Sequence, residues 1–62
     1  MCESNAYLKK DDELEPLMEN VCLVRPQGDE LVLKDILGEQ KIIKAKLVEM
    51  NLIDHKIILE ET

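Results

Sequence analysis

Residues 21–34 read VCLVRPQGDELVLK, and this stretch decides the fold. Two apolar segments flank Pro26-Gln27-Gly28-Asp29, a combination that is typical of a hairpin turn in which Gly28 adopts a positive φ. In the second segment Leu31 and Leu33 are separated by one residue, which places both side chains on one face of a strand. The stretch therefore predicts a β-hairpin with one apolar face.

Turn signals continue on both sides of this hairpin and recur about every dozen residues. Between them, Ile57 and Leu59 alternate as in a half-buried strand, while Pro16 predicts that its segment is an edge strand or is interrupted. We therefore expect one all-β domain over residues 1–62, built as a small antiparallel meander or barrel-like sheet of short strands. The other turn signals are Lys10-Asp11-Asp12-Glu13, Leu37-Gly38-Glu39-Gln40, Asn51 and Asp54-His55.

The segment Gln40–Met50 is compatible with two kinds of secondary structure. Ile43, Leu47 and Met50 have the spacing of one helix face, whereas Ile43, Ala45 and Leu47 alternate as in a strand. A glycine lies shortly before the segment and no Ser, Thr or Asp caps its start, so a helix has no clear beginning. We favour a strand here and keep the helix as the alternative.

The composition limits the classes of function. A chain of 62 residues forms a modest core, which a dimer interface or a bound metal would supplement, and it is too short to enclose a deep catalytic pocket. We therefore do not expect an enzyme. The net charge is −6 and Tyr7 is the only aromatic residue, which we expect to pack with the core and point its hydroxyl at the rim. The acidity and the lack of stacking aromatics argue against binding to nucleic acid or to anionic membranes.

The expected location follows from the apolar runs and the thiols. The longest runs, Val21–Val24 and Ile57–Leu59, are far too short to cross a membrane, and the start of the chain lacks a signal-peptide pattern. We therefore expect a cytoplasmic protein, in which thiols are usually reduced. Two cysteines in that compartment are free or metal-bound more often than they are bridged.

Cys2 is the residue with the most distinctive chemistry. If Met1 is removed, Cys2 carries a free amine and a thiolate, which together close a five-membered chelate ring around a metal. Two such residues, related by a two-fold axis in a homodimer, offer two nitrogens and two sulfurs in the tetragonal arrangement that suits Ni(II) or Cu(II). If Met1 is retained, the deprotonated backbone amide of Cys2 replaces the amine. The competing interpretation is an incidental exposed thiol, because no partner ligand lies nearby in sequence.

Other residue types that can carry chemistry have simpler interpretations. We expect Cys22 to be a small buried or half-buried apolar residue, which is the common fate of a free cysteine. His55 lies at a predicted turn without a companion at ligand spacing, so we expect a solvated turn residue. Asp11-Asp12-Glu13 is expected to form a solvated hairpin tip rather than a cation site. We expect Met18 and Met50 to fill the core.

The order of several segments resembles CooT, a family of small nickel-binding proteins associated with carbon monoxide dehydrogenase maturation. The segments are Met1-Cys2-Glu3, Tyr7-Leu8, Pro26-Gln27-Gly28-Asp29, Ile36–Gln40 and Asp54–Glu60. The resemblance implies a compact β-fold, a homodimer and a Ni(II) site formed by the N-terminal cysteine of each subunit, a role that falls on Cys2. It implies no role for Cys22 or His55.

The sequence thus leads to three hypotheses. The first is a nickel-binding metallochaperone or storage protein, which holds Ni(II) between two subunits through Cys2 and serves a nickel enzyme such as carbon monoxide dehydrogenase. The alternative is a small RNA-binding β-barrel protein, whose binding is salt-sensitive and independent of Cys2. The third is a structural module that binds a protein partner through a strand edge.

Overall fold

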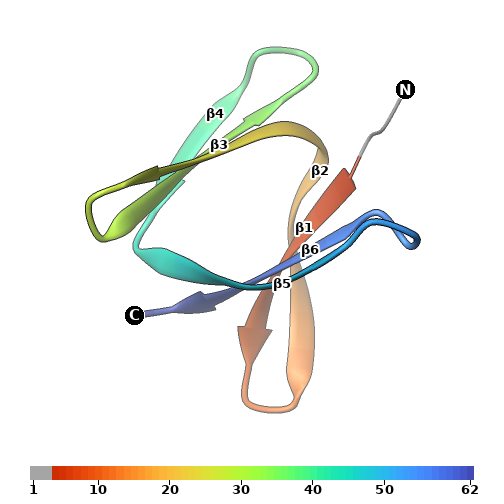
Figure 1. Ribbon diagram of the computed structural model, residues 1–62, viewed down its shortest axis with the longest axis vertical. Helices are drawn as coiled ribbons and strands as arrows, with labels where there is room; N and C mark the ends of the chain where they lie inside the picture. Colours follow the sequence, from red (N-terminus) through yellow and green to blue (C-terminus); the bar gives the residue numbers. More distant parts are fainter. Residues whose placement is uncertain (1–3) are drawn as a thin grey trace.

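The computed structural model describes residues 4–62, which form six β-strands joined by short turns (Figure 1). The all-β prediction is confirmed. The ambiguous segment from 40 to 50 is also extended, as favoured, although a break at Lys44 divides it into two strands. The strands are β1 (Ser4–Lys10), β2 (Glu13–Gln27), β3 (Glu30–Asp35), β4 (Gln40–Ile43), β5 (Ala45–Asn51) and β6 (Lys56–Glu61).

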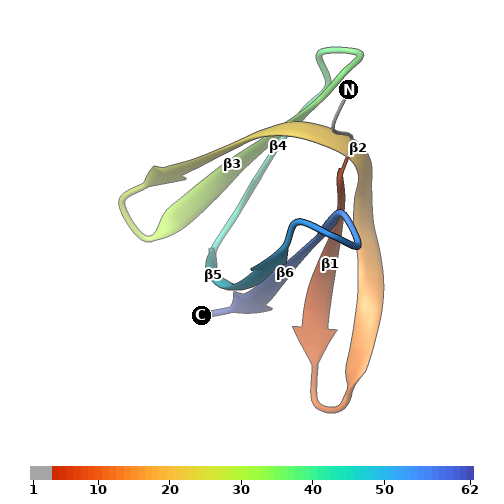
Figure 2. The same cartoon turned by 45° about the vertical axis from the view of Figure 1, so that its right-hand side comes forward.

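The strands belong to one sheet with the order β4-β3-β2-β1-β6-β5, which curls into a half-barrel (Figures 1 and 2). Strands β1 to β4 form the predicted antiparallel meander. The expectation of a fully antiparallel sheet is wrong at one place, because β6 pairs parallel with β1. After β4, at one edge of the sheet, the chain passes through Lys44 directly into β5, at the other edge, and the hairpin of β5 and β6 pairs with the free side of β1.

Two tight hairpins have the predicted turns. Gln27 pairs with Glu30 across a two-residue turn, and Gly28 has a φ of 65°. A positive φ at the first of two central residues is typical of a type II′ turn, which matches the twist of the flanking strands. At the tip of β1 and β2, Asp11 also has a positive φ, and its neighbours are exposed as expected for a solvated hairpin tip.

A bend in β2 gives the sheet its curl. Asn20 has a φ of 55°, in the left-handed region that asparagine tolerates better than most residues. Before the bend, residues 13–18 pair with β1 alone, and after it residues 21–27 pair with β3. Pro16 lies in the first part, where the other side of the described strand has no partner. Strand β2 as a whole lies inside the sheet, but Pro16 lies on a stretch of it that is unpaired on one side, and the pairing with β1 is irregular next to it at Leu17.

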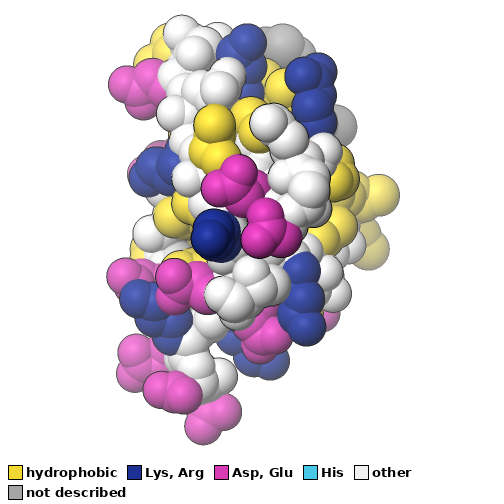
Figure 3. All heavy atoms as spheres, turned by 90° about the vertical axis from the view of Figure 1, so that its left-hand side faces the viewer, with side chains coloured by type: hydrophobic (Ala, Val, Ile, Leu, Met, Phe, Trp, Pro, Cys, Tyr) yellow, Lys and Arg dark blue, Asp and Glu magenta, His cyan; other side chains and the backbone are white. Residues whose placement is uncertain are grey.

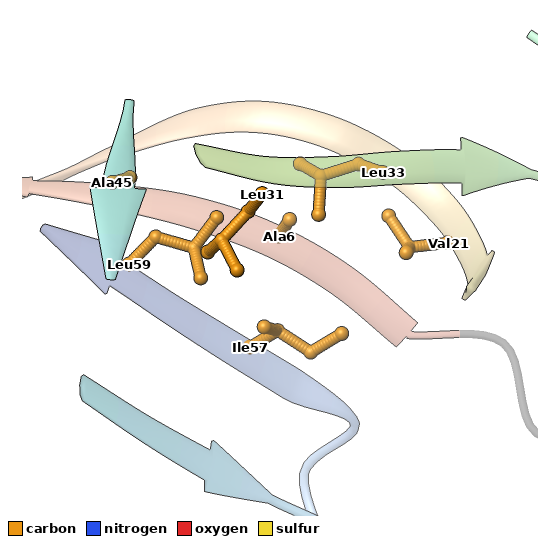
Figure 4. Close-up of a cluster of buried hydrophobic side chains, with 7 residues drawn as sticks. All are labelled: Ala6, Val21, Leu31, Leu33, Ala45, Ile57 and Leu59. Carbon is orange, nitrogen blue, oxygen red and sulfur yellow. The ribbon is translucent and has the colours of Figure 1, made fainter. Parts of the chain in front are cut away.

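The core occupies the space enclosed by the curled sheet (Figure 4). The predicted pairs Leu31 with Leu33 and Ile57 with Leu59 are buried together, which confirms both alternations. Leu33 and Leu59 are the largest fully buried side chains. The complete buried cluster draws on β1, β2, β3, β5 and β6 and comprises Ala6, Val21, Leu31, Leu33, Ala45, Ile57 and Leu59.

The predictions for three other side chains have mixed outcomes. Met18 packs against the core as expected. Tyr7 is only half-buried and is not among the side chains that pack on the core, because Ala6 and Leu8 on either side of it face inward. Met50 is exposed rather than core-filling, because it lies at the open end of the half-barrel, where it pairs with Ile57.

Candidate metal site at the N-terminal end of the sheet

The predicted ligand Cys2 lies outside the described residues, which start at Ser4. Its neighbourhood is nevertheless bounded by chain length. Three residue steps separate Cys2 from Asn5, and an extended chain covers at most about 11 Å in that interval. The groups around Ser4 and Asn5 are therefore those that Cys2 can reach.

Two hydrogen bonds and one strand pairing fix Asn5 at the start of β1. Its amide nitrogen donates to the carbonyl oxygen of His55 at 2.9 Å. Its side-chain Oδ1 accepts from the amide nitrogen of Asn20 at 3.2 Å, which joins it to the bend of β2. In the parallel ladder Asn5 pairs with Lys56. The N-terminal end of β1 is thus held between the bend of β2 and the turn that precedes β6.

His55 is placed at the same end of the sheet. It is exposed and lies in the turn between β5 and β6, as predicted for a solvated turn residue, and its φ is 55°. The sequence alone does not associate His55 with Cys2, because the two are far apart in the chain and no local pattern encodes the parallel pairing of β1 with β6. The one feature of the sequence that points to His55 as a candidate ligand is that it is the only histidine. An imidazole nitrogen is a ligand that nickel accepts.

A small hollow opens beside this end of β1, and Ser4, Cys22, Met50 and Ile57 are among its lining residues. The expectation that Cys22 is buried or half-buried is wrong, because its side chain is exposed. The cause is the irregular pairing between β2 and β3, where Cys22 is the extra residue. Its Sγ donates to the carbonyl oxygen of Asp35 at 3.4 Å.

The described part of one chain does not assemble a metal site by itself. Over residues 4–62 no group of three or more His, Cys, Asp or Glu side chains is arranged to hold an ion. The acids Asp11, Asp12 and Glu13 lie at the opposite end of β1 from Ser4. Figure 1 shows their turn, between β1 and β2, at the bottom of the molecule. A transition-metal site therefore needs ligands from the first three residues, from a second chain, or from both.

The surface charges are mixed. On the face in Figure 3, acidic and basic side chains lie among one another rather than in separate stripes. Exposed ion pairs join Lys10 to Glu15 at 3.5 Å and Lys46 to Glu60 at 3.7 Å. This face lacks the continuous basic stripe that a phosphate backbone would need. In the segment from 4 to 62 we find no helix of the length and hydropathy required to cross a membrane.

Comparison with known proteins decides the family. Residues 1–60 match the family described as CO dehydrogenase accessory protein CooT. The chain belongs to the CooT family. The matched range includes Cys2 and the turn at His55. CooT is a family of accessory proteins rather than of catalytic enzymes, in agreement with the expectation from chain length.

The CooT fold is also seen in a solved structure. A crystal structure from Carboxydothermus hydrogenoformans, whose chain is assigned to CooT, superposes with a TM-score of 0.93 at 38% identity and covers 98% of both chains. Among curated relatives, an uncharacterized Archaeoglobus fulgidus protein is 42% identical over 69% of this chain and 96% of its own. An uncharacterized Methanothermobacter thermautotrophicus protein is 38% identical over 97% of this chain and 89% of its own.

Proposed function

We propose that this CooT protein is a nickel-binding metallochaperone or storage protein that serves the maturation of carbon monoxide dehydrogenase. Ni(II) is its cargo and is held between two copies of the chain by Cys2 of each copy. The family match to CO dehydrogenase accessory proteins, which extends over Cys2, supports this proposal. The thiolate of Cys2 and the nitrogen beside it form the type of ligand pair that nickel favours in a tetragonal plane.

The observation that carries the proposal is the 2.9 Å hydrogen bond from the Asn5 amide to the His55 carbonyl oxygen. It fixes Asn5, at the start of β1, beside the backbone of His55, the only histidine of the chain. An extended chain covers at most about 11 Å between Asn5 and Cys2, and within that reach we propose that Cys2 and His55 share one ion. Each copy then offers sulfur, backbone or terminal nitrogen, and imidazole.

Sharing the ion between two copies explains how a chain with so few candidate ligands can bind a metal. The described residues hold no ready cluster of ligands, so a second copy supplies the missing donors. A contact between two copies about a two-fold axis is the commonest dimer symmetry. A site at the exposed end of a strand leaves the ion accessible for transfer to a client enzyme.

A titration with Ni(II) under reducing conditions tests the proposal. We expect one ion for every two chains, together with a thiolate-to-nickel charge-transfer band. The Cys2→Ser variant should lose both signals. The Cys22→Ser variant is the matched control, because Cys22 is exposed and its single hydrogen bond goes to a backbone carbonyl, so it should bind as the wild type does.

Native mass spectrometry of the same samples gives the stoichiometry and reports whether Met1 is present. Retention of wild-type nickel affinity by Cys2→Ser would contradict the proposal. So would binding of one ion per monomer with no shared species in the spectrum.

A further inference from the structure

A hollow of about 330 Å³ opens at the end of the half-barrel that lies opposite the start of β1. It is found where the turn between β2 and β3 approaches the beginning of β5, on the side where Figure 1 shows the C-terminus. Two members of the buried cluster, Leu31 and Ala45, form its base and are 5% and 4% exposed. Pro26 and Leu47 are exposed apolar residues of its wall. The hollow therefore brings solvent to the edge of the core.

The hollow exists because the curled sheet does not close at this end. Strands β3 and β5 approach each other here but are not neighbours in the sheet. The side chain of Ala45, at the start of β5, is too small to fill the space between them. Ala45 is held by its pairing with Glu61 and by the bond from the Thr62 amide to the Lys44 carbonyl oxygen at 3.3 Å. With the tight turn at Gly28 on the other side, the hollow is bounded by two hydrogen-bonded elements.

Two carboxylates lie among the residues that line this hollow. Asp29 is exposed in the turn, and Glu30 is half-buried at the start of β3. Within residues 4–62 neither of them belongs to an ion pair. The basic side chain among the lining residues, Lys46, is engaged by Glu60 at 3.7 Å on the neighbouring strand. The hollow thus combines an apolar base with two carboxylates that have no cationic partner.

This combination complements one long basic side chain. Such a side chain lays its aliphatic stem on apolar surface and keeps its charged head in polar surroundings. Arginine suits the carboxylates better than lysine, because its guanidinium group offers parallel N–H donors to a carboxylate, and arginine is enriched in protein interfaces. The volume is at the lower end of the range for small-molecule sites, about 300–1,000 Å³, so the hollow suits one side chain rather than a whole ligand.

From this charge and shape complementarity we infer that the hollow is a docking site for a partner protein, which inserts an exposed arginine side chain between the turn at Gly28 and β5. The stem contacts the apolar lining, and the guanidinium group pairs with Asp29 and Glu30. The site lies at the opposite end of the half-barrel from Asn5 and His55. The inference is therefore independent of the nickel proposal, and a partner held here leaves the other end of the sheet accessible.

The test is a titration of the isotope-labelled full chain with the peptide acetyl-Ala-Ala-Arg-Ala-Ala-amide, followed through amide chemical shifts. We expect the shifts to be confined to residues 28–31 and 45–47. The same peptide with citrulline in place of arginine has the same shape and no charge, and it should bind about threefold more weakly or worse. Butylguanidinium carries the stem and head without a peptide and should also bind more weakly. Equal affinities of butylguanidinium and the peptide would indicate a small-molecule site and contradict docking of a protein segment.

Neutral variants test the two carboxylates. Asp29→Asn with Glu30→Gln keeps the side-chain shapes and removes both charges, so we expect the peptide dissociation constant to rise about threefold or more. The matched control is Asp12→Asn with Glu13→Gln, which changes the net charge equally at exposed acids of the other hairpin. It should stay close to the wild type. Equal weakening in the two variants would reduce the binding to net charge and overturn the inference.

Truncation tests the apolar wall. Leu47 and Leu14 are 46% and 43% exposed, and both lie in strands. Leu47→Ala should weaken peptide binding about twofold or more, because apolar contact with the arginine stem is lost, whereas Leu14→Ala should not. Circular dichroism checks that every variant keeps the wild-type strand spectrum. Absence of peptide binding to the wild type, or shifts centred outside the hollow, would also overturn the inference.

Discussion

The amide nitrogen of Asn5 lies 2.9 Å from the carbonyl oxygen of His55 and donates a hydrogen bond to it. This bond joins residues from opposite ends of the chain at the first rung of the parallel pair between β1 and β6. The rung sets the position of Asn5, at the start of the described chain, next to the only histidine of the sequence. A chemical role for that histidine then becomes testable.

Replacement of His55 by Asn should weaken nickel binding without harming the fold. The imidazole is lost, and we expect the nickel dissociation constant to rise about tenfold or more, the scale on which loss of a supporting group changes metal affinity. Asn is the right substitute because His55 has a φ of 55°, which Asn adopts more readily than Ala does. Calorimetric titration measures the affinity. An unchanged dissociation constant would remove His55 from the proposed site.

Removal of the Asp35 carboxylate should destabilise the turn between β3 and β4. Asp35 is buried, and its Oδ1 accepts from the amide nitrogens of Leu37 and Glu39, both at 2.9 Å. Asp35→Ala leaves both donors without this partner, and we expect the free energy of unfolding in urea to fall by about 1–3 kcal/mol. Asp35→Asn keeps an acceptor oxygen and should lose less. Equal losses in the two variants would contradict this account.

Truncation of Leu33 should cost the most stability of the changes considered. Its side chain is fully buried at the centre of the core, so Leu33→Ala removes packing and leaves a cavity. We expect the free energy of unfolding to fall by about 2–5 kcal/mol, which is a large share of the stability of a small domain. Leu14→Ala, at an exposed position, is the control and should change stability by less than about 0.5 kcal/mol. Similar losses for both variants would mean that the buried cluster is not the stabilising core.

The local elements of the fold could be predicted from the sequence. The turn at Gly28 and the apolar faces of Leu31 with Leu33 and of Ile57 with Leu59 are determined by nearby residues, because turn chemistry and strand alternation are short-range effects. The strand interpretation of residues 40–50 also followed from local alternation and from the missing helix cap. Each of these predictions is confirmed by the structure.

The long-range arrangement could not be predicted in the same way. The parallel pairing of β1 with β6 depends on how the sheet curls, and no local pattern encodes it. The exposure of Cys22 depends on an irregular register between β2 and β3, and the exposure of Met50 on the open end of the half-barrel. The candidate site could not be predicted for the same reason, because His55 lies next to the start of β1 only through the parallel pairing of β1 with β6. The role of Cys2 stays a prediction that the titration addresses.

The parallel pair has a consequence for the order of events during biosynthesis. Strand β1 precedes the other described strands in translation, yet one of its two neighbours in the sheet is β6, which follows all five of them. The nascent N-terminus therefore has no fixed neighbours on that side until the β6 residues have been translated. If nickel binds as proposed, a site that depends on the pairing of β1 with β6 can form only after the β6 residues have been translated.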